Sequence, residues 1–85
     1  MKYKVILDSR GNIDLGENPY KQINGAYREV VYCETIEECQ KAVREYITKY
    51  NLRASQWAGG KVFTSKNKYL GYISYNGRFW EENNI

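Results

Sequence analysis

The stretch TIEECQKAVREYITKYN, residues 35–51, decides the fold. It opens with a capping box, in which the Thr35 hydroxyl accepts from the backbone N–H of Glu38 and the Glu38 carboxylate returns to the N–H of Thr35. Apolar side chains then recur at spacings of three and four residues, the pattern of a helix that buries one stripe. The stripe consists of Ile36, Cys39, Val43, Tyr46, Ile47 and Tyr50. We therefore predict an amphipathic helix that ends near Tyr50.

Strand patterns flank this helix on both sides. The segments with alternating, β-branched or aromatic residues are Lys2–Asp8, Tyr27–Tyr32, Lys61–Thr64, Tyr69–Tyr75 and Arg78–Glu81. Asn51 suits the left-handed position after the helix, with Leu52 folded back on the last turn. Asn76-Gly77 predicts a type I′ hairpin turn. The sequence does not decide whether Ile13–Leu15 is a short strand or part of a loop. Glu82–Ile85 is expected to be a tail. The order β-(β)-β-α-β-β-β predicts an α+β fold, with one helix packed on an antiparallel sheet of four to five strands.

Length and cysteine usage limit the class of protein. Eighty-five residues make a single domain, 1–85, with one modest core. The two cysteines are too few for a disulfide scaffold. The apolar run within Met1–Asp8 is too short for a signal peptide, and no stretch approaches a membrane span. We expect a cytoplasmic protein with reduced thiols and no membrane partner.

The residues that most often carry catalysis are missing from this sequence. It contains no histidine, so neither acid–base chemistry nor a cysteine nucleophile has its usual base. Cys39 lies on the apolar stripe and Cys33 ends a strand, which favours two small buried side chains over a metal pair. Gly59-Gly60 precedes a strand, whereas a phosphate-binding loop opens a helix. We therefore predict no enzyme activity and no catalytic, cofactor-binding or metal-binding residue.

The C-terminal half is basic and aromatic. Residues 41–80 carry eight basic groups and one acidic group, together with nine aromatic residues. Cations neutralise phosphates or steer acidic partners, while rings stack on bases or anchor protein interfaces. The predicted partner-binding residues are Tyr69, Tyr75, Arg78, Trp80, Lys61, Lys66 and Lys68. The competing interpretation is a solvated hairpin whose aromatics are ordinary core residues.

Strand alternation decides between these interpretations. One face of Tyr69–Tyr75 must pack under the helix, so about half of its aromatic residues belong to the core. A binding surface arises if Leu70, Tyr72 and Phe63 point inward, because this leaves Tyr69, Tyr75 and Trp80 outside with Arg78. Such an exposed aromatic patch in a small protein indicates binding.

Gly59-Gly60-Lys61-Val62-Phe63 and Gly71–Trp80 resemble the closing hairpins of small phage proteins. The small size, the abundance of residues with A/T-rich codons and the missing catalytic residues resemble phage-encoded anti-defence inhibitors, including anti-CRISPR proteins. The resemblance implies a protein that occludes a host protein in a bacterial cytoplasm. That group shares no motif, so the resemblance assigns no residue.

Three functions follow from the sequence. The first is a non-enzymatic inhibitor that binds a larger host protein of defence or nucleic-acid processing through an aromatic and basic sheet face. The second is a nucleic-acid-binding module that uses the cations of the C-terminal hairpin, although the acidic N-terminal half and the pI near 8.9 are atypical of such modules. The third is self-association, in which Tyr27–Tyr32 or the last strand pairs across a two-fold axis to give a homodimer.

Overall fold

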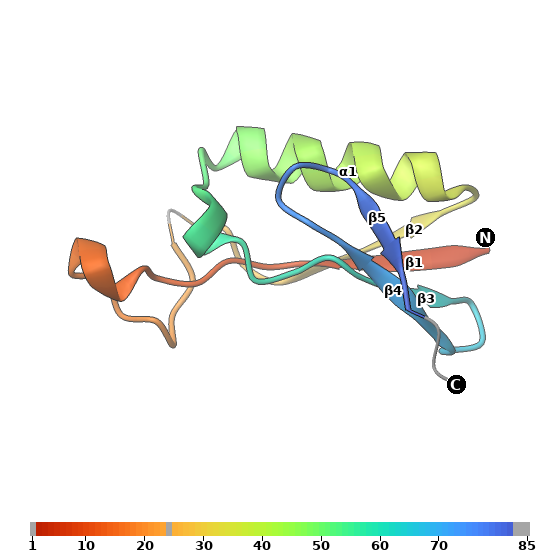
Figure 1. Ribbon diagram of the computed structural model, residues 1–85, viewed down its shortest axis with the longest axis horizontal. Helices are drawn as coiled ribbons and strands as arrows, with labels where there is room; N and C mark the ends of the chain where they lie inside the picture. Colours follow the sequence, from red (N-terminus) through yellow and green to blue (C-terminus); the bar gives the residue numbers. More distant parts are fainter. Residues whose placement is uncertain (1, 24, 83–85) are drawn as a thin grey trace.

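The protein folds as one helix laid across a five-stranded antiparallel sheet (Figure 1). The computed structural model describes residues 2–23 and 25–82. The strands are β1 (Tyr3–Leu7), β2 (Glu29–Cys33), β3 (Lys61–Thr64), β4 (Tyr69–Ile73) and β5 (Phe79–Glu81), and the helix is α1 (Ile36–Lys49). The predicted α+β class, with its helix between two groups of strands, is confirmed. The predicted tail extends beyond the described residues.

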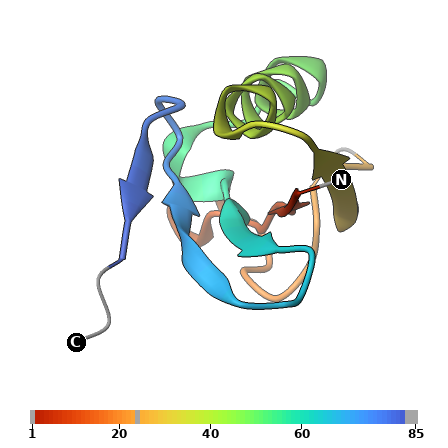
Figure 2. The ribbon, with the colours of Figure 1, turned by 90° about the vertical axis from the view of Figure 1, so that its right-hand side faces the viewer.

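The sheet has the order β2-β1-β3-β4-β5, so β2 and β5 are its two edges. Helix α1 packs against β1 and β2. Viewed from the end, the sheet twists so strongly that the β4–β5 hairpin rises beside the helix (Figure 2). This arrangement covers one face of the sheet with α1, and no helix among the described residues covers the opposite face.

The helix begins and ends where local chemistry predicts. The Thr35 hydroxyl accepts from the N–H of Glu38, and the Glu38 carboxylate accepts from the N–H of Thr35. At the other end Asn51 has a φ of 51°, and the N–H of Leu52 donates to the carbonyl of Ile47 at 3.0 Å. This pattern is a Schellman motif, which satisfies carbonyls that the last turn leaves open.

The predicted stripe of α1 forms the core together with the covered sheet face. Val5, Val43, Val62 and Ile73 are fully buried. Trp57 lies among them, donates from Nε1 to the carbonyl of Ile73 at 3.1 Å and meets the Tyr46 ring edge-on. Among the described residues, every buried side-chain nitrogen and oxygen has a hydrogen-bond partner. The core is therefore small but complete.

The structure decides one open question and corrects one local prediction. Ile13–Leu15, which the sequence left open, forms a 3₁₀ turn, η1, capped by the Asn12 side chain. The hairpin turn at Asn76-Gly77 is not type I′, since only Gly77 of the two has positive φ, whereas type I′ needs both. The N–H of Gly77 donates to Ser74, and the N–H of Ser74 donates to Arg78. These bonds define a type I turn followed by a left-handed glycine, another common hairpin closure.

Both cysteines are buried and free, as their positions predict. Burial, followed by the neighbouring Cys33 thiol, raises the pKa of Cys39 to about 12. At pH 8 this leaves on the order of one Cys39 in ten thousand as thiolate, the form that reacts. We expect no measurable reaction of either thiol with an aromatic disulfide reagent in the native protein, and reaction of both after guanidinium is added. A rapid native reaction would contradict the burial.

No helix in the part of the chain that the structure describes has the length and hydropathy needed to cross a membrane.

Candidate interaction surface

The strand register identifies the side chains on the sheet face that α1 leaves uncovered. Buried Val5 and Val62 are paired and point toward α1, so their neighbours Lys4 and Phe63, which are also paired, point away. Extending this register across the sheet gives one set of side chains, which we call the bare face. It comprises Lys4, Ile6, Val30, Tyr32, Lys61, Phe63, Tyr69, Tyr72, Arg78 and Trp80.

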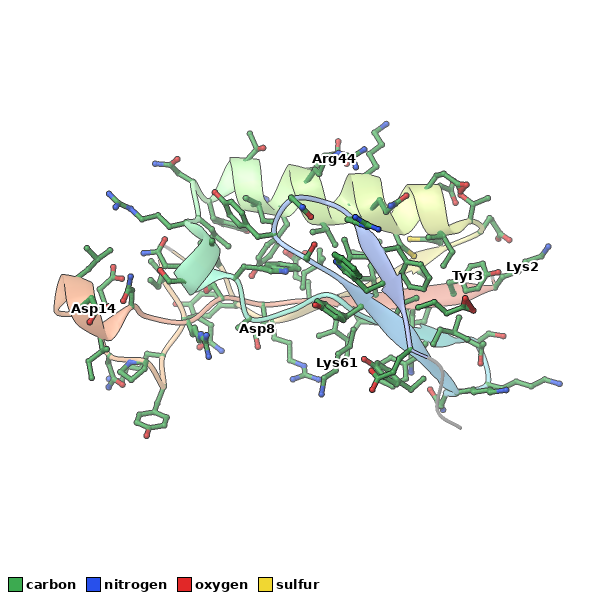
Figure 3. The ribbon with its side chains drawn as sticks, in the orientation of Figure 1. Lys2, Tyr3, Asp8, Asp14, Arg44 and Lys61 are labelled. Atoms are coloured by element: carbon green, nitrogen blue, oxygen red, sulfur yellow. The ribbon has the colours of Figure 1, made fainter. Side chains whose placement is uncertain are left out.

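Large rings are exposed on the bare face. The exposed fractions of Tyr32, Tyr72 and Trp80 are 55%, 43% and 42%. Tyr72 is paired with Trp80 on one side and with Lys61 on the other, so two rings and a cation lie in a row across three strands. Lys61 extends away from the helix in Figure 3. Exposed rings that share one face with cations are the arrangement that the binding hypothesis requires.

Arg78 and Trp80 form a stacked pair. The guanidinium carbon of Arg78 lies 4.1 Å from the centroid of the Trp80 ring. The indole Nε1 donates to the hydroxyl of Ser74 at 3.2 Å. These two contacts hold the ring in place and set a cation against it. The prediction that Arg78 and Trp80 share the bare face therefore agrees with the structure.

A β-bulge changes which residues of β4 face outward. Val62 is paired with Gly71, but the next residue, Phe63, is paired with Tyr69, so Leu70 has no counterpart in β3. Leu70 packs toward the core, while Tyr69 turns outward beside Phe63, with ring centroids 5.6 Å apart. Tyr72 and Phe63 lie on the bare face and do not point inward, because Tyr72 precedes and Phe63 follows a fully buried residue, Ile73 and Val62 respectively.

The phenol of Tyr69 stays neutral. Partial burial, and then its hydrogen bond to Glu82, raise the pKa of Tyr69 above the ordinary tyrosine value. Its hydroxyl is accordingly a hydrogen-bond donor at any physiological pH. Tyr69 contributes a half-buried ring to the bare face and no charge.

Three further lysines lie on or beside the bare face. Lys4 donates to Asn67 and holds its ammonium over the Phe63 ring, 5.6 Å from the centroid. Lys66 and Lys68 occupy the β3–β4 turn, where both backbone N–H groups donate to the Thr64 hydroxyl and both side chains are exposed. The turn thus presents two cations next to the strand that carries Lys61.

Tyr75 is the predicted site residue that the structure places elsewhere. Its hydroxyl donates to the carbonyl of Leu52 at 2.9 Å, on the helix side of the sheet. The same turn is tied to α1, since Gln40 donates to the carbonyl of Gly77 at 3.1 Å. Tyr75 therefore anchors the β4–β5 turn to the segment after the helix and does not join the bare face.

Sequence reasoning missed Lys4, Tyr32 and Tyr72 as members of the bare face. Lys4 carried a usable signal, because it alternates with the apolar residues Tyr3, Val5 and Leu7 along the first strand. Tyr32 becomes a neighbour of Lys4 only through the β1–β2 pairing. Tyr72 points outward because it alternates with buried Ile73, and the sequence of that strand alone does not say which of its two faces is buried.

Within residues 2–23 and 25–82, no three metal-ligating side chains come together. No protein-family model matches the sequence, and no curated protein and no solved structure is significantly similar to it.

Proposed function

We propose that this chain is a non-enzymatic binding protein that docks its bare face on an acidic surface of a larger protein and acts by occlusion. The observation that carries the proposal is the row of Lys61, Tyr72 and Trp80, with Arg78 stacked on Trp80. Trp, Tyr and Arg dominate the residues whose removal weakens protein interfaces. The cations lie on and around these rings, which fits a negatively charged partner.

The identity of the partner is a further part of the proposal. Its support is the resemblance in size and composition to phage-encoded anti-defence proteins. On that basis the partner is a bacterial host protein of defence or nucleic-acid processing, and the protein acts in the host cytoplasm. A host surface that normally binds nucleic acid is basic, and the bare face has no negative charge with which to mimic phosphates. The bare face would therefore bind acidic groups beside such a surface.

Single-stranded nucleic acid is the second candidate ligand. The observation that favours it is the set of half-exposed rings on one sheet face, on which bases can stack while lysines neutralise phosphates. Against it, Glu29 and Glu34 lie at the β2 end of the sheet and the net charge is only +3. The two candidates differ in salt dependence, since phosphate contacts make affinity fall steeply with salt.

The decisive variant is the double substitution Tyr72→Ala with Arg78→Ala. Both side chains are exposed, so the melting temperature should stay within a few degrees of the parent value. Recovery of a specific host protein on the immobilised chain should fall, and its affinity should weaken by about a hundredfold or more. The matched control is Tyr20→Ala with Arg53→Ala, an exposed tyrosine and an exposed arginine outside the bare face.

Nucleic acid is tested in the same series with single- and double-stranded oligonucleotides at low and at physiological salt. Tight, salt-sensitive binding that the double variant abolishes would replace the protein-partner proposal by the nucleic-acid one. Undiminished recovery of the host protein by the double variant would end the assignment to the bare face.

A further inference from the structure

Strand β2 is an edge without the usual protection. It pairs only with β1, over five consecutive residue pairs and without a bulge. It contains no lysine or proline, the residues that commonly block an edge. The other edge, β5, has only three residues. Edge β2 is therefore the longer and more regular template for another strand.

The sequence around β2 is complementary to itself when it is read antiparallel. Residues 28–34 are Arg-Glu-Val-Val-Tyr-Cys-Glu, with a cation at one end and an anion at the other, equally far from Val31. We propose that β2 pairs antiparallel with β2 of a second copy of this chain, about a two-fold axis through Val31. The two sheets would then continue into one. The inference concerns a different surface from the bare face and does not depend on the proposed function.

The charges select this register. With Val31 facing Val31 of the second copy, Arg28 faces Glu34 of the second copy, and the symmetry makes this contact twice. With the axis at Val30, Arg28 would face the uncharged Tyr32 of the second copy. With the axis at Tyr32, Arg28 would face a residue beyond the end of β2. Opposite charges directly across a strand pair stabilise it, whereas like charges destabilise it.

The side chains between these charges also match. The proposed register sets the ring of Tyr32 against Val30 of the second copy, and both side chains are exposed in the single chain. Aromatic and β-branched residues are a favourable cross-strand pair. A two-fold axis that passes through a residue of the strand is perpendicular to the joined sheet, so each side chain keeps its face in both copies. Both helices therefore lie on one side of the joined sheet, and both bare faces lie on the other.

A groove beside β2 fits the same arrangement. It runs between β2 and α1, where Val31, Ala42 and Tyr46 form an apolar floor and Glu45 and Lys49 stand on the helix side. The proposed pairing brings Val31 of each copy together at this groove and sets the two α1 helices antiparallel on either side of the axis. Half-buried Val31 would become buried. The opposite charges of Glu45 and Lys49 then suit two antiparallel helices.

The joined sheet would also enlarge the proposed binding surface. Tyr32 lies at the β2 edge of the bare face, so Tyr32 of each copy would lie near the axis. Two bare faces in one plane present the same rings and cations twice, which would favour an extended or a two-fold symmetric partner.

The test is the oligomeric state of the purified full chain, measured by sedimentation and light scattering from micromolar to millimolar concentration. We expect a concentration-dependent dimer. Arg28→Glu should raise its dissociation constant by about tenfold or more, because each attraction becomes a repulsion. Arg28→Glu combined with Glu34→Arg should restore dimerisation, since the swap reproduces the opposite-charge pair.

Arg53→Glu is the matched control, an exposed arginine outside β2 whose reversal should leave the dimer unchanged. Circular dichroism and the melting temperature verify that each variant folds. A monomer over the whole concentration range would overturn the proposal. A dimer that Arg28→Glu does not weaken, or that the double swap does not restore, would overturn it as well, because two copies would then meet elsewhere.

Discussion

Replacing Gly60 by alanine should remove a large part of the protein's stability. Gly60 has a φ of 107°, a backbone conformation that residues other than glycine rarely adopt. A Cβ added there would lie 2.2 Å from the carbonyl oxygen of Ile73. Its N–H donates to Ile6 and its carbonyl accepts from Ile73, so it joins β1 to the end of β4. The atom in the way is backbone, which cannot move without breaking these bonds.

We expect the free energy of unfolding to fall by about 3 kcal/mol or more. That is a large part of the stability of so small a domain, which lies near the lower end of roughly 5–15 kcal/mol. Urea denaturation followed by circular dichroism measures the change. The matched control is Gly16→Ala, since Gly16 also has positive φ, 77°, but no atom within 4 Å of an added Cβ. Its cost should be about 1–2 kcal/mol, and equal losses at the two positions would contradict the steric explanation.

The helix could be predicted from sequence because its determinants are local. The Thr35–Glu38 capping box, the left-handed Asn51 and the apolar stripe each involve residues within one or two turns of one another. All three point to the same element, and nothing distant opposes them. The α+β class follows from that helix and from the strand patterns on either side of it.

The outward-facing residues of β4 could not be predicted in the same way. Alternation within Tyr69–Ile73 gives two faces, but a bulge lets both Tyr69 and Tyr72 point outward while Leu70 and Ile73 point inward. The bulge exists only in the pairing of β4 with β3. A one-residue shift in pairing reverses the face of every following side chain. A glycine inside a strand, such as Gly71, can mark a bulge, but it does not show which neighbouring residue is displaced.

Tyr75 illustrates the same limit at a turn. The Asn76-Gly77 dipeptide marks a hairpin correctly, but it does not say toward which layer the hairpin leans. That direction comes from contacts between distant parts of the chain: Tyr75 with Leu52, and Gln40 with Gly77. The exposure of the lysines could be predicted without knowing these contacts. Lys61, Lys66 and Lys68 are exposed because long charged side chains rarely become fully buried, whatever the register.

The two tryptophans should respond very differently to the same truncation. Trp57 is 9% exposed, donates from its indole to Ile73 and contacts Tyr46 in the core. Trp57→Ala removes a buried ring and leaves a cavity, so we expect a loss of about 3–5 kcal/mol. Such a loss would remove most of the stability of so small a domain.

Trp80→Ala removes a ring that is 42% exposed and is held mainly by Arg78 and Ser74. Its cost should be about 1 kcal/mol, the order of an exposed cation–π contact together with partial burial. Urea denaturation followed by circular dichroism compares the two variants without relying on tryptophan fluorescence. Iodide quenching of the parent protein gives an independent check, because only the Trp80 ring should be accessible. Similar losses of stability would mean that Trp80 is a structural residue, and the bare face would then lose the ring on which its binding role depends most.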